Sequence, residues 1–97
     1  MRKFTQDSQL VDYVNSRIGD PDAADEVIIM DGFPGEAVGL FYDEEMDRWR
    51  LVYCRERIIG ALMGRNRWDR GSAEEWLEFN IVRGIPPGGP IIIESIT

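Results

Sequence analysis

Residues 71–84, GSAEEWLEFNIVRG, hold the clearest helix signal in the chain. Ser72 and Glu75 have the spacing of a capping box, in which each side chain accepts a hydrogen bond from the backbone N–H group of the other residue. Gly84 suits the left-handed position that often ends a helix, and the two prolines that follow it prevent the helix from continuing. The pattern therefore predicts a helix over about residues 73–83.

One face of this predicted helix is apolar and the opposite face carries three glutamates. At 100° per residue, the apolar face is made by Ala73, Trp76, Leu77, Asn80 and Ile81. Asn80 is unusual there, because a buried amide must find hydrogen-bond partners. Two interpretations stay open: the amide fixes the loop over residues 84–89, which we favour, or it faces a ligand.

The rest of the chain predicts an α+β domain. Helices are expected from Asp7 or Ser8 to Gly19 and over residues 57–64, with an acidic loop over residues 20–25. Strands are expected over residues 26–31, 36–42, 48–53 and 91–96. The loop over residues 43–47 has a length typical of a hairpin between the second and third of these strands. We therefore expect a mainly antiparallel sheet of about four strands, with helices packed on one face.

Two strands carry information about the faces of this sheet. In residues 48–53 the aromatic and leucine side chains alternate with Arg48 and Arg50, so the arginines are expected to face water. The isoleucines of the last strand point to both faces, which favours an interior position. The predicted core contains Trp49, Leu51, Ile58, Leu62, Trp76, Leu77, Ile91 and Ile93.

The composition predicts one small globular domain over residues 1–97, with 43% hydrophobic residues available for a core. The longest apolar run is far too short to cross a membrane, and we find no signal-peptide pattern. The single cysteine, Cys54, cannot form a disulfide within the chain. We therefore expect a cytoplasmic protein that has no membrane partner.

The net charge of −7 is unevenly distributed along the chain. Residues 1–47 carry twelve acids and three bases, a net charge of −9, whereas residues 48–70 carry seven arginines and two acids, a net charge of +5. An acidic chain is a poor candidate for non-specific binding of nucleic acid, although a local group of arginines can still bind phosphate.

The composition also disfavours several kinds of chemistry. There is no histidine, which removes the commonest general base and zinc ligand, and one cysteine cannot build a thiolate metal site. The glycines fit neither a phosphate loop nor a dinucleotide motif. We expect no cofactor, no metal and no catalytic residue. An enzyme would need a concave site with strongly perturbed carboxylates around Asp31, Glu36 or Asn80.

The candidate binding residues are the segment made of Arg65, Arg67, Trp68 and Arg70, together with Asn80. Arginines beside an exposed aromatic ring can hold phosphate and stack on a base. The alternative, which we favour, is that these arginines pair with the acidic half of this chain or of a second copy.

Scattered short motifs carry a resemblance to known proteins. They are Asp31-Gly32-Phe33, Tyr42, Glu78-Phe79-Asn80, Gly84, and Gly89-Pro90 followed by Ile91, Ile92 and Ile93. Together they resemble a group of short uncharacterised bacterial and phage proteins, over about residues 26–96. The segment over residues 65–70 is not part of that pattern. The resemblance implies a small bacterial or phage accessory protein and brings no known activity.

We therefore expect a small non-catalytic accessory or protein-interaction protein that acts through an acidic surface. Its partner would be another protein or a second copy of itself, as in a homodimer. One alternative is binding of a nucleotide or nucleic acid through Arg65, Arg67, Trp68 and Arg70. The other alternative is a small enzyme with a site made of carboxylates and Asn80.

Overall fold

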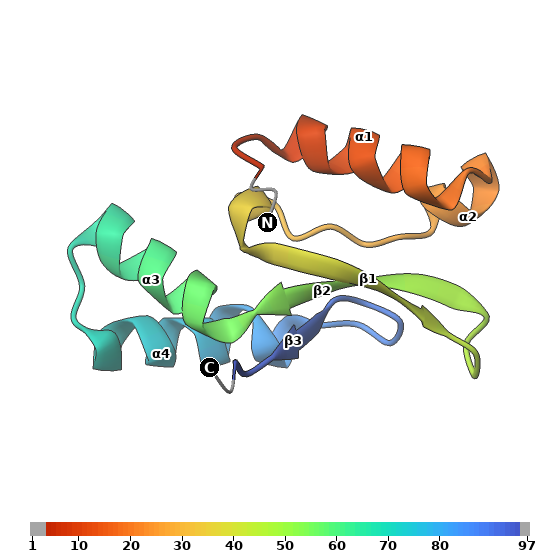
Figure 1. Cartoon of the computed structure of the whole chain (residues 1–97). Helices are drawn as coiled ribbons and strands as arrows, with labels where there is room; N and C mark the ends of the chain where they lie inside the picture. Colours follow the sequence, from red (N-terminus) through yellow and green to blue (C-terminus); the bar gives the residue numbers. More distant parts are fainter. Residues whose placement is uncertain (1–3, 96–97) are drawn as a thin grey trace.

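The computed structural model describes residues 4–95 and has the predicted α+β class, with four α-helices and a three-stranded mixed sheet (Figure 1). The elements in chain order are α1 (Asp7–Ile18), α2 (Pro21–Asp25), η1 (Pro34–Glu36), β1 (Ala37–Asp43), β2 (Arg48–Cys54), α3 (Arg55–Asn66), α4 (Arg70–Asn80), η2 (Val82–Gly84) and β3 (Ile91–Ile93).

The sheet contains one predicted hairpin and one unexpected parallel pair. β1 and β2 are antiparallel, from Ala37 opposite Tyr53 to Asp43 opposite Arg48. β3 runs parallel to β2, and the strand order β1-β2-β3 places it at an edge of the sheet. The predicted interior position of the last strand is therefore wrong, and Ile93 is 44% exposed. A parallel pair needs a long crossover, which α3 and α4 supply.

The strand predicted over residues 26–31 is not formed. This segment runs from α2 back to η1 alongside the sheet (Figure 1), and it pairs with no strand among residues 4–95. The backbone N–H of Met30 donates instead to the hydroxyl of Tyr53, at 3.0 Å. Its apolar residues serve packing, because Val27 is buried and Ile29 lies against the core.

The first two helices begin at side chains that accept hydrogen bonds from the backbone. The Oε1 atom of Gln9 accepts from the N–H of Gln6 at 3.1 Å, so α1 is capped by Gln6 rather than by Asp7 or Ser8. Gly19 ends α1 with φ of 80°, as predicted. Most of the predicted loop over residues 20–25 is the helix α2, with Asp20 as the N-cap whose carboxylate accepts from the N–H of Asp22.

The fourth helix begins and ends about three residues earlier than predicted. Asp69 is its N-cap, and the carboxylate accepts from the N–H of Ser72 at 2.8 Å. The predicted capping box of Ser72 and Glu75 is therefore wrong. Gly84 ends the 3₁₀ turn η2 and is not in the left-handed conformation.

The buried side chains form one contiguous cluster, which includes only part of the predicted core. Leu51, Ile58, Leu62 and Leu77 are buried, whereas Trp49, Trp76 and Ile91 are half-buried. Arg48 and Arg50 are also half-buried, although they were expected to face water. Arg50 donates to Asp43 at 3.1 Å and to the carbonyl of Gly89 at 2.8 Å, because the loop before β3 covers it.

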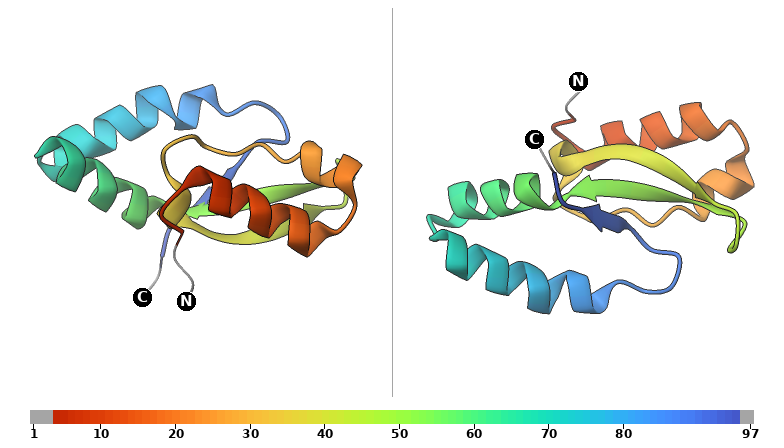
Figure 2. Two further views of the ribbon diagram at one scale, coloured as in Figure 1. Left: turned by 90° about the horizontal axis from the view of Figure 1, so that it is seen from above. Right: turned by 60° about the horizontal axis from the view of Figure 1, so that its bottom comes forward.

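The helices do not all lie on one face of the sheet. α1 and α2 lie over the β1–β2 hairpin, whereas α3 and α4 extend beyond the end of the sheet (Figures 1 and 2). The described molecule is accordingly elongated, with extents of 41 × 26 × 25 Å. Among its described helices, none has both the length and the apolarity needed to span a bilayer.

Candidate functional site

The arginines of residues 65–70 turn towards different parts of the molecule. Arg65 donates to the carbonyl of Gly32 at 2.6 Å and to Oε1 of Glu36 at 3.3 Å, and its guanidinium lies 5.0 Å from the centre of the Phe33 ring. The side chain of Glu36 is only 6% exposed. Arg65 therefore fastens the chain over residues 32–36 to α3.

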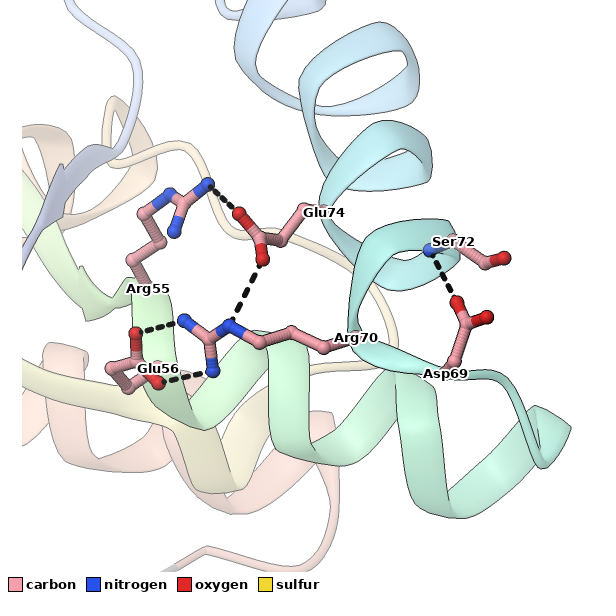
Figure 3. A network of polar contacts seen from close by, with 6 residues as sticks. All are labelled: Arg55, Glu56, Asp69, Arg70, Ser72 and Glu74. Carbon is pink, nitrogen blue, oxygen red and sulfur yellow. Dashed lines mark hydrogen bonds and ion pairs between the residues drawn. The ribbon is translucent and has the colours of Figure 1, made fainter.

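Arg70 joins the two helices of the α3–α4 hairpin (Figure 3). Its guanidinium donates two hydrogen bonds to Glu56, at 3.0 and 2.6 Å, and forms an ion pair with Glu74 at 2.9 Å. Glu74 also pairs with Arg55 at 3.4 Å. The hydrogen bonds with Arg70 lower the pKa of the Glu56 carboxyl, and those with Glu56 raise the pKa of Arg70. The charge of Arg70 is thus balanced by acids of its own chain.

The other two candidates of this segment lie in the turn between α3 and α4. Arg67 is exposed and ends α3 in the left-handed conformation, with φ of 55°. Trp68 is half-buried against Trp76, with ring centres 6.2 Å apart. Arg65 and Arg70 thus contact groups of their own chain, Trp68 packs on Trp76, and Arg67 is exposed.

Asn80, the fifth candidate, lies at the end of α4 and is exposed. Its Nδ2 donates to the carbonyl of Trp76 at 3.0 Å. The expected bond to the loop over residues 84–89 is not found among the described contacts. Asn80 instead lies with Trp76 between two depressions in the surface of α4.

The first depression, which we call the α4 groove, has a volume of about 330 Å³. One wall is the chain over residues 28–33, and the other wall is η2 and the loop that follows it. The groove is lined in part by Ile28, Met30, Asp31 and Phe33 on the first wall and by Ile81 and Ile85 on the second. Its surface is mainly apolar, and Asp31 and Asn80 are its polar side chains.

The second depression, of about 290 Å³, continues along α4 from the same two residues. Trp68, Phe79 and Glu75 contribute to it beside Trp76 and Asn80. Phe79 is 55% exposed, and the guanidinium of Arg83 lies 4.3 Å from the centre of its ring. The two depressions thus form one continuous surface, because both include Trp76 and Asn80.

Three long-range hydrogen bonds position the first wall of the α4 groove. The hydroxyl of Tyr53 accepts from Met30, and the carboxylate of Asp7 accepts from the N–H of Gly32 at 3.1 Å. Arg65 donates to the carbonyl of Gly32. Burial of Tyr53 raises the pKa of its hydroxyl to about 12, so the hydroxyl stays protonated at neutral pH. The wall is therefore held in place from the sheet, α1 and α3.

The side chains that line this surface include two carboxylates, and two arginines lie against its aromatic rings: Arg65 over Phe33 and Arg83 over Phe79. Asp31 belongs to the α4 groove and Glu75 to the second depression, and neither lining contains a lysine or arginine. Glu36 lies in another depression, with Gly60, Gly64 and Arg65, so Asp31 and Glu36 do not converge. Within residues 4–95, no three metal-ligating side chains gather as they would around an ion.

No protein-family model, no curated protein and no solved structure matches this chain. The resemblance to short bacterial and phage proteins therefore stays a prediction.

Proposed function

We propose that this chain is a small non-catalytic accessory protein that binds another protein through the α4 groove and the adjoining depression. The observation that carries the proposal is the continuous surface around Trp76 and Asn80, which is apolar at its base and acidic at its edge. The cytoplasmic location predicted from the sequence belongs to the same proposal.

The residue types of this surface support a protein partner. Aromatic residues and methionine are enriched in protein interfaces, and tryptophan is enriched among residues that dominate binding energy. Trp76, Phe79 and Met30 contribute such side chains here. Phe79 is more than half exposed in this chain, so a partner would remove a large apolar area from water.

Two observations favour this proposal over the alternatives from the sequence. Arg65 and Arg70 are engaged with Glu36, Glu56 and Glu74, which leaves less free positive charge to hold phosphate. Asp31 is exposed and separated from Glu36, whereas paired carboxylate catalysis needs two such groups around one substrate.

The proposal is tested by photo-crosslinking in the native host. A benzophenone amino acid replaces Phe79 in one variant and Val11 in a control variant, since Val11 is 39% exposed but lies on α1. We expect a discrete protein adduct from position 79 that is absent from position 11. Equal adducts from both positions, or none from position 79, would contradict binding through this surface.

A further inference from the structure

We infer that the α4 groove takes a linear peptide segment of the partner, in which an apolar side chain stands next to a lysine or arginine. This inference rests on the proposed function and specifies the chemistry of the partner. It follows from the apolar base of the groove, the polar groups at its edge and its continuation along α4.

The apolar residues at the base of the groove favour an apolar side chain of the partner as an anchor. Ile28 and Met30 line it on the first wall. Ile81 and Ile85 face them from the second wall. A volume of about 330 Å³ lies at the small end of the range in which proteins enclose ligands, so the groove has room for few side chains.

The edge of the groove calls for a positive charge beside that anchor. Asp31 is an exposed carboxylate. Asn80 uses Nδ2 on the carbonyl of Trp76, and its Oδ1 accepts no hydrogen bond from any described residue. Trp76 adds an aromatic ring, the side chain that best attracts a cation. A lysine or arginine can pair with the Asp31 carboxylate or donate to Oδ1 of Asn80, whereas an acidic ligand would be repelled by Asp31.

The continuation of the surface calls for an elongated occupant. A segment that passes Trp76 and Asn80 leaves the α4 groove and enters the second depression, where Glu75 offers another carboxylate. The same carboxylates disfavour nucleic acid, because its phosphates would meet Asp31 and Glu75. The net charge of −7 also speeds the approach of a basic segment.

The test begins with selection of a random peptide library on the full chain, and the enriched peptides are then synthesised and titrated. Ile28→Arg introduces a cation and bulk into the groove at a half-buried residue outside the main core cluster. We expect it to weaken binding by about tenfold or more. Asp31→Asn should weaken binding by about threefold to tenfold, as expected for loss of a partly exposed ion pair.

The matched control is Asp25→Asn, which removes the same charge from an exposed residue at the end of α2. It should change the affinity by less than about twofold. Enriched peptides that depend on Ile28 but contain no lysine or arginine, or that ignore Asp31→Asn, would overturn the inference and leave the proposed function standing.

The crosslinking experiment distinguishes failure of the peptide inference from failure of the proposed function. If position 79 yields a protein adduct but no enriched peptide responds to Ile28→Arg, the partner uses a folded surface and the linear segment is excluded. If position 79 yields no adduct, the proposed function fails as well.

Discussion

Tyr53 connects the core of the molecule to the wall of the α4 groove, because its ring is buried while its hydroxyl accepts from Met30. The alternating pattern of residues 48–53 predicted the inward direction of this side chain. It could not predict the partner, since the strand-like residues around Met30 suggested pairing with another strand. A single tertiary hydrogen bond here replaces part of a strand ladder.

We predict that Tyr53→Phe lowers the free energy of unfolding by about 1 to 3 kcal/mol, because the N–H of Met30 loses its acceptor. The pKa of Tyr53 rises from 10.0 to about 12 on folding, so the unfolded chain releases this proton first as the pH rises. The contribution of Tyr53 protonation to the free energy of unfolding is therefore fully present below about pH 10 and is lost as the pH rises towards 12.

Urea denaturation over this alkaline range provides the measurement. The variant should lose less stability than the original chain as the pH rises, because it lacks the titrating hydroxyl. Parallel stability curves for the two proteins would show that Tyr53 is not the group that controls this loss.

Asn80 shows how far single residues could be interpreted without the fold. The sequence marked it as unusual, since it lies among apolar residues on the predicted helix face, but the structure leaves Asn80 exposed rather than buried. Its position beside Trp76 and Asp31 depends on where the chain over residues 28–33 lies, and nothing within α4 specifies that. The candidate residue was found from local pattern, whereas its surroundings required the tertiary structure.

At the scale of elements, local sequence patterns predicted some features correctly and missed others. The β1–β2 hairpin and the end of α1 at Gly19 were predicted correctly from strand alternation and turn residues. The start of α4 was missed because Asp69 and Ser72 are both good capping residues. An earlier start places Arg70 on the helix, where it reaches Glu56 of α3. Only contacts between helices distinguish the two starts.

The loop before β3 illustrates the same point with two glycines. Gly88 is left-handed, with φ of +79°, and the guanidinium of Arg48 packs so closely that an added Cβ would lie 2.7 Å from Nη1. Gly84, which was predicted to need that freedom, has an ordinary φ and open space around its Cα. The glycine that must adopt the left-handed conformation is therefore Gly88, four residues further along the chain than predicted.

We predict that Gly88→Ala destabilises the protein by about 1 to 2 kcal/mol, from left-handed strain and displacement of Arg48. Gly84→Ala is the matched control, and its effect should stay within about 0.5 kcal/mol. Chemical denaturation of both variants measures the difference. A larger loss from Gly84→Ala would show that the turn at η2, rather than the loop before β3, is the demanding position.

At the scale of the whole molecule, much of the segregated charge is used internally. Arg50 pairs with Asp43 and Arg65 with Glu36, so arginines of the basic segment do reach the acidic half of the chain. Arg55 instead pairs with Glu74, and Arg70 pairs with both Glu56 and Glu74. These contacts remove several of the arginines that an electrostatic dimer would have used. The charge pattern of the sequence could not reveal this, because it does not show which acids fold close to which bases.

The homodimer predicted from the sequence therefore needs another contact, and β3 offers one. It lies at an edge of the sheet, no strand among residues 4–95 pairs with its outer side, and Ile93 is 44% exposed. An edge strand can pair with a second copy through free backbone groups. We predict a dimer that persists at high salt, because apolar and backbone contacts are screened little by ions.

Sedimentation velocity at low and high salt measures this prediction. Ile93→Lys should convert the dimer to a monomer, because it places a charge on the edge strand, whereas Val11→Lys, an exposed position on α1, should leave it intact. A dimer that dissociates as salt rises would instead indicate an interface between acidic and basic surfaces, since attraction between charges is screened beyond about 8 Å at physiological ionic strength. A monomer under all conditions would remove self-association and leave the α4 groove as the proposed route to a partner.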